Sequence, residues 1–233
     1  MLKVRDHGVK DYVALRDMDA TDVGVLTDED RSCLDELGEY LVSTDAWQRF
    51  AIWLLHKHFE PDAGEVFVER VLSGPRRIET GPIERPAFSA HGLSATAIRL
   101  DGEIGSGVGV IGMEFAEPAD FGSVAPLSAD DEAALAGIAD RLQVHGKTQR
   151  FGVRLIRDPL GLSDGEVLLE TCDAAERTLH CRVTERDRLP IHKTVETSWR
   201  WKPGLGDAGA TVMQECLAAC VQESDGHSYA HAY

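Results

Sequence analysis

Two histidines, His56 and His58, stand two residues apart at the end of a predicted strand. Alternate side chains on a strand point the same way, so both rings can converge on one metal ion through their nitrogens. Glu65 and Glu69 follow on the next predicted strand, and each is a candidate further ligand or catalytic general base. His91 is a candidate third imidazole ligand. The alternative is a pair of polar residues that are only hydrogen-bonded or solvated.

A second group of metal-ligand types lies near the C-terminus, where Cys216, Cys220, His227 and His231 follow one another within sixteen residues. Two thiolates and two imidazoles are a tetrahedral zinc set of the structural type. Two other interpretations stay open. The cysteines are buried in the core beside a loose tail, or the tail folds back and brings a histidine beside the first histidine pair in one mixed site.

The stretch "RFAIWLLHKHFEPDAGEVFVE" resembles a segment of uncharacterised fungal and bacterial proteins that carry a similar "LLHKHF" motif. That resemblance implies no known activity. The His-x-His pair followed by an acidic residue is also similar to the metal motif of cupin barrels. The helix predicted before it and the repeat described next do not suit a cupin.

An internal repeat organises the chain. When residues 26–102 are aligned with residues 127–203 at an offset of 101, 18 of 77 positions are identical. Chance at average composition gives about four or five, so we expect a tandem duplication. The remaining chain then divides into an N-terminal segment (1–25), a Gly/Pro-rich linker (103–126) and a C-terminal helix with a Cys/His tail (204–233).

Each copy has the pattern of one helix followed by four strands. Capping-box residues begin the helix at Thr27 and at Ser128, and leucine or isoleucine recurs at helical spacing after each. Four short segments rich in branched and aromatic residues follow in each copy. We therefore expect an α+β fold of two α-β-β-β-β halves, related by a pseudo-twofold, with helices packed on antiparallel sheets.

The repeat also separates shared residues from residues that occur in one copy. Arg157, Asp158 and Pro159 stand where the first copy has its histidine pair. If the histidines bind a metal, the protein has one such site, and it lies in the first half. Glutamates matching Glu65 and Glu69 occur in the second copy without histidines nearby in the sequence, which favours a scaffold role for them.

Composition limits the partners. Forty acidic against 24 basic residues in 233 give a net charge of −16, which disfavours binding to nucleic acid phosphates. No stretch has the length of a signal peptide or a membrane span, so we expect a cytoplasmic protein without a membrane partner. Five cysteines without an export signal favour thiols or metal ligands over a disulfide framework.

These patterns lead to one hypothesis and one alternative. The hypothesis is a cytosolic metal-binding protein, with zinc as the favoured divalent ion and a metal-dependent small-molecule site in the first copy. The alternative is a non-catalytic module that binds a ligand or a protein and holds at most a structural zinc. A small-molecule partner and a homodimer are both compatible with the sequence.

Overall fold

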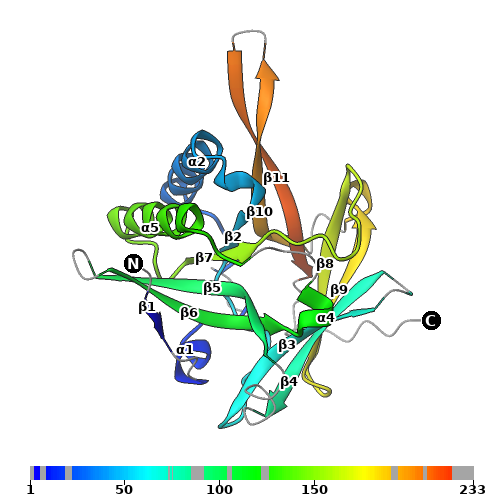
Figure 1. The fold of residues 1–233 in the computed structure, drawn as a ribbon. Helices are drawn as coiled ribbons and strands as arrows, with labels where there is room; N and C mark the ends of the chain where they lie inside the picture. Colours follow the sequence, from blue (N-terminus) through cyan, green and yellow to red (C-terminus); the bar gives the residue numbers. More distant parts are fainter. Residues whose placement is uncertain are drawn as a thin grey trace.

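The computed structural model describes residues 3–5, 9–18, 23–72, 74, 76–84, 92–103, 107–121, 126–189, 194–206 and 209–221. Strands are the commonest regular structure among these residues (Figure 1). The strands are β1 (Lys3–Arg5), β2 (Phe50–Leu54), β3 (Glu65–Leu72), β4 (Arg77–Glu84), β5 (Ser94–Glu103), β6 (Gly107–Ala116), β7 (Phe151–Leu155), β8 (Glu166–Asp173), β9 (Thr178–Glu185), β10 (Thr194–Gly206) and β11 (Gly209–Val221).

Ten of these strands close into a mixed β-barrel. Among the described residues, the order around the ring is β6-β3-β4-β9-β8-β11-β10-β2-β7-β5, and β5 pairs with β6 to complete it. The pairs β3–β6 and β8–β11 are parallel, and the other pairs of the ring are antiparallel. The expected α+β fold with open antiparallel sheets is therefore wrong. Closure satisfies the backbone groups that open sheets leave at their edges.

Two strands that the sequence did not predict make this closure. β6 lies in the segment expected to be a linker, and β11 lies where a C-terminal helix was expected. Ala210, Cys216 and Cys220 follow helical spacing, yet β11 pairs along its length with β10 and in part with β8. Pairing with two neighbouring strands outweighs the local pattern, because most of the stabilisation of a sheet comes from such contacts.

The two expected helices, with their capping boxes, are confirmed. α2 (Asp28–Ser43) is capped by Thr27, and α5 (Ala129–Val144) is capped by Ser128. Their apolar faces pack together against one side of the barrel (Figure 1). The largest core cluster joins them to β2, β7 and β10 and includes Leu34, Leu37, Leu41, Leu135, Ile138, Leu142, Phe50, Ile52, Phe151, Val153, Trp199 and Trp201.

The remaining helical segments are short. They are α1 (Val9–Val13), η1 (Ala46–Gln48), α4 (Pro118–Phe121) and η2 (Arg186–Arg188). No helix in the described ranges has the length and apolar character needed to cross a bilayer.

Residues 101 positions apart occupy corresponding places in the barrel, which we divide into a first half (26–116) and a second half (127–221). β2 and β7 pair about Ile52 and Val153, and β4 and β9 pair about Glu79 and His180. Each central pair consists of residues separated by 101. The two halves therefore meet at both of these strand pairs in a twofold-like register.

Ion pairs cross between the halves in the same reciprocal way. Arg49 donates to Asp131 and Arg150 donates to Asp30, both with Nε–Oδ distances of 3.2 Å. Each arginine lies in a Gln-Arg-Phe segment that occurs in both copies, at 48–50 and at 149–151. Each aspartate belongs to the capping box of the other half. The same arginine and aspartate, present in both copies, thus connect the start of each long helix to the opposite half.

Candidate metal centre

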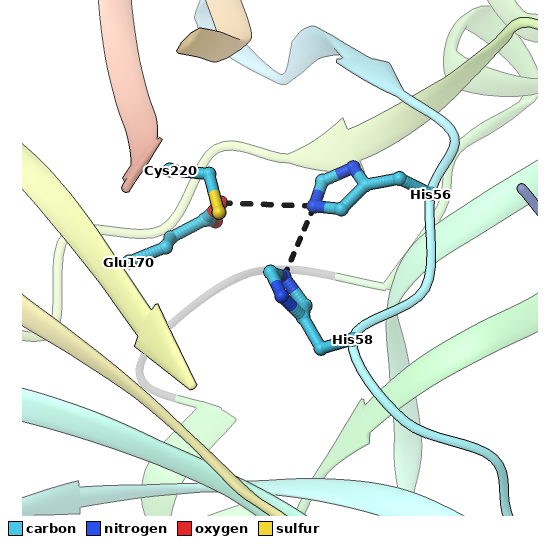
Figure 2. Close-up of side chains that lie close together, drawn as sticks. All are labelled: His56, His58, Glu170 and Cys220. Atoms are coloured by element: carbon cyan, nitrogen blue, oxygen red, sulfur yellow. Dashed lines mark hydrogen bonds and ion pairs between the residues drawn. The ribbon is translucent and has the colours of Figure 1, made fainter. Parts of the chain in front are cut away.

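Four buried side chains of metal-ligand type converge in the structure (Figure 2). They are His56, His58, Glu170 and Cys220, and their candidate ligand atoms all lie within 4.8 Å of one another. Their exposed fractions are 1%, 8%, 1% and 0%. Such a set of two nitrogens, one oxygen and one sulfur could hold a metal ion.

Three separate parts of the fold supply these residues. His56 and His58 follow the end of β2, Glu170 lies on β8, and Cys220 lies near the end of β11. β8 and β11 run parallel, and Cys220 is the register partner of Glu170, which places the two residues side by side. Figure 2 shows the two histidines on one side of the cluster and Glu170 and Cys220 on the other.

Hydrogen bonds set the orientation of His56. Its Nδ1 lies 2.7 Å from the carbonyl oxygen of Leu54. A carbonyl oxygen only accepts, so Nδ1 carries a proton, and in the neutral ring Nε2 then presents its lone pair to the cluster. Nε2 lies 3.0 Å from Nε2 of His58 and 3.9 Å from Oε2 of Glu170. A backbone acceptor behind the ring is the usual support of a metal-binding histidine.

Glu170 is held by two partners outside the cluster. The hydroxyl of Thr197 donates to its Oε2 at 2.9 Å. Arg154 Nη1 lies 3.5 Å from its Oε1. Because both contacts stabilise a carboxylate, Glu170 is positioned to act as an anionic ligand.

A charged network inside the barrel borders the cluster. Arg154 on β7 contacts Glu69 on β3, Glu114 on β6 and Glu170 on β8. None of these strands is a neighbour of β7 in the ring, so the contacts span the barrel interior.

Burial, and then the nearby carboxylate of Glu114, raise the pKa of Tyr12 well above its ordinary value.

Glu65 and Glu69, the predicted catalytic acids, lie outside the four-residue cluster. Glu65 accepts from Arg177 at 2.5 Å, and this hydrogen bond holds the pKa of its carboxyl below the ordinary value. Glu69 accepts from Thr96 at 2.9 Å and pairs with Arg157. Both carboxylates therefore form ion pairs with arginines of the other half, which agrees with the scaffold role that their repetition indicated.

The predicted C-terminal zinc set divides between different places. Cys220 joins the first histidine pair, whereas the thiol of Cys216 donates to the carbonyl of Ala218 and packs against Val167 on β8. Burial raises the pKa of the Cys216 thiol well above its usual range. Within the described residues, Cys216 is therefore not part of the candidate centre.

The other predicted ligands, His91, His227 and His231, lie outside the described residues. All five cysteines are thiols, in line with the expectation that they form no disulfide framework.

Sequence reasoning missed Glu170 as a ligand. Its own copy has Arg157 and Pro159 at the positions of the histidine pair, yet the structure places Glu170 beside the histidines of the other copy. The reciprocal relation of the two copies was the available signal. The glutamate of each copy lies beside the residues that follow β2 or β7 of the other copy. Residues that are close in the sequence do not reveal this contact.

A scan against protein-family models gave no match, and searches of curated proteins and of solved structures gave none either.

Proposed function

We propose that this protein binds one divalent metal ion, zinc in particular, through His56, His58, Glu170 and Cys220. The ion would be a structural component of the barrel. The observation that carries the proposal is the convergence of four buried donors from three distant segments within 4.8 Å. Buried polar side chains are oriented by their partners, and four of metal-ligand type that converge on one point form a candidate metal site.

The donor types suit zinc. Imidazole nitrogen, thiolate sulfur and carboxylate oxygen bind zinc at about 2.0–2.3 Å, which places tetrahedral donors about 3.3–3.8 Å apart. Nε2 of His56 already lies 3.0 Å from His58 and 3.9 Å from Glu170. Side-chain movements of about 1 Å would bring the widest donor pair into range.

The charges nearby also support a bound cation. The network around Arg154 contains three glutamates and two arginines, so it has one excess negative charge. A thiolate at Cys220 would add another. A divalent ion would balance both charges. This matters inside a barrel, because an unpaired charge costs more free energy in a medium of low dielectric constant. The network residues are Glu69, Glu114, Glu170, Arg154 and Arg157.

A structural role is favoured over a catalytic one. Catalytic zinc keeps one coordination position open for water or substrate, whereas structural zinc has four protein ligands. Here four protein donors are available and all are buried. Glu65 and Glu69, the candidate general bases of the first copy, are paired with arginines.

The test is the metal content of purified, untagged protein, measured by elemental mass spectrometry for the wild type, for variants of two proposed ligands and for two matched controls. We expect about one zinc per chain in the wild type. Cys220→Ala and Glu170→Gln should lose it, because the first removes the sulfur donor and the second replaces an anionic oxygen donor with a weaker, neutral amide oxygen. Cys216→Ala changes a cysteine on the same strand, and Glu69→Gln changes the corresponding glutamate, so both should retain the metal.

Two results would overturn the proposal. One is a wild type without metal after expression and reconstitution in zinc. The other is equal metal content in Cys220→Ala and Cys216→Ala. A different metal at the same four residues would preserve the site and replace zinc as its occupant.

A further inference from the structure

Both halves of the barrel place a buried glutamate opposite a residue from the other half. In the first arrangement, Glu170 accepts from Thr197 and faces His56. In the second, Glu69 accepts from Thr96 and faces Arg157. Both threonine hydrogen bonds are 2.9 Å long. Each residue of the first arrangement differs by 101 from its counterpart in the second.

The other two candidate ligands also have counterparts. Pro159 stands 101 residues after His58. Ala116 is the register partner of Glu69 on a parallel strand, as Cys220 is the register partner of Glu170. The carboxylate and its threonine are thus common to both places. The three remaining donors occur only in the first.

A positive charge accompanies the carboxylate where those donors are missing. Arg157 contacts Glu69, and its side chain is 6% exposed. Its Nη1 also donates to the carbonyl of Asp120 on α4 at 3.0 Å. A buried carboxylate is strongly destabilising unless a cation or several donors compensate it. In the second arrangement a guanidinium meets this requirement within the chain itself.

We infer that the barrel has two equivalent cation positions, and that the second is a latent metal site in which the guanidinium of Arg157 takes the place of the ion. This inference rests on the proposed function, because it assigns a metal ion to the first position. Arg154 contacts both glutamates. The cation inferred here is therefore a second one beside each carboxylate, a divalent metal in the first position and Arg157 in the second.

Two reciprocal triple variants test this equivalence. The transfer variant, Ala116→Cys/Arg157→His/Pro159→His, gives the second position the donors of the first. It should bind two zinc ions per chain, where the wild type binds one. The exchange variant, His56→Arg/His58→Pro/Cys220→Ala, gives the first position the residues of the second. It should bind no zinc and should melt at the same temperature with and without a chelator.

Arg157→Ala is the matched control, because it removes the guanidinium without adding ligands. It should melt at a lower temperature than the wild type and bind no additional zinc. Metal content is measured by elemental mass spectrometry, and melting by circular dichroism on each full-length chain with and without chelator.

The outcomes separate this inference from the proposed function. A wild type without zinc rejects the proposed function. A wild type with one zinc and a folded transfer variant that still binds one rejects the latent site. If the transfer variant does not fold, the exchange variant decides: melting below the metal-free wild type rejects the equivalence, and melting above it, independently of chelator, supports it.

Discussion

At the scale of single residues, corresponding positions of the two halves place different side chains opposite a buried carboxylate. His56 faces Glu170, and the corresponding Arg157 faces Glu69. The glutamates and their threonines are the same in both places. Under the proposed function, the residue opposite therefore decides whether a metal or a guanidinium is the partner. Thr197 is fully buried and contributes one hydroxyl to Glu170. Such supporting residues orient a ligand without touching the metal.

Thr197→Val should therefore weaken metal binding. The substitution preserves shape but removes the hydroxyl that orients Glu170, and loss of such support commonly costs about 10–100-fold in metal affinity. Thr96→Val, which removes the matching hydroxyl from Glu69, should leave zinc affinity within about twofold, because Glu69 is not a ligand. Competition with a chromogenic chelator measures both. Equal losses in the two variants would argue against Glu170 as a ligand.

At the scale of elements, the packing of α2 against the barrel depends on a residue without a side chain. A Cβ built on Gly38 would lie 2.3 Å from Nε1 of Trp201. Trp201 on β10 is 1% exposed and belongs to the main core cluster, so it has no free space to enter. The glycine allows the helix to approach the indole closely, although glycine is a poor helix former.

Gly38→Ala should accordingly destabilise the protein. Alanine is favoured over glycine by about 1 kcal/mol in an exposed helix, but overpacking a core costs about 1–3 kcal/mol. At this clash distance we expect overpacking to dominate, with a net loss of about 1–2 kcal/mol in the free energy of unfolding. Glu39→Ala, an exposed neighbour on α2, should change stability by less than about 0.5 kcal/mol. Urea denaturation of both variants makes the comparison, and a stabilised Gly38→Ala would show that the indole can move.

At the scale of the whole molecule, reciprocal ion pairs hold the two halves together. Asp30 and Asp131 pair with arginines of the opposite half, as do Glu65 and Glu166. Burial opposes ionisation of Asp30, but Lys147, the Thr27 amide and Arg150 outweigh it and hold its pKa below the ordinary value. Arg76 likewise lowers the pKa of Glu166. These ion pairs between the halves therefore require ionised carboxylates.

The sign of the pH dependence follows from these lowered pKa values. A carboxyl group with a lower pKa in the folded state than in the unfolded state stabilises the fold above its unfolded pKa. That stabilisation is lost as the pH falls through the folded pKa. The free energy of unfolding of metal-free protein should therefore decrease below about pH 4, near the ordinary carboxyl pKa.

Urea denaturation at a series of pH values measures this dependence. Asp30→Asn should reduce its slope, because that side chain no longer titrates. Stability that stays constant between about pH 5 and about pH 3 would contradict the assignment of these ion pairs as a source of stability.

Local sequence signals account for part of this fold. The capping boxes at Thr27 and Ser128 and the spacing of leucines predicted both long helices, and branched residues predicted four strands in each half. The pair His56 and His58 marked where metal-ligand residues gather. These features depend on neighbours within about four residues or on alternation along one strand, so the sequence records them directly.

Barrel closure and the completed ligand set were decided by tertiary structure. β6 is rich in glycine and β11 has helical spacing, so only pairing with distant strands makes them part of the ring. Glu170 and Cys220 reach the histidines because the halves cross, over sequence separations of more than a hundred residues. The local propensity of a segment carries no information about such contacts. They stabilise the protein only when strands that are distant in the sequence have paired in the barrel.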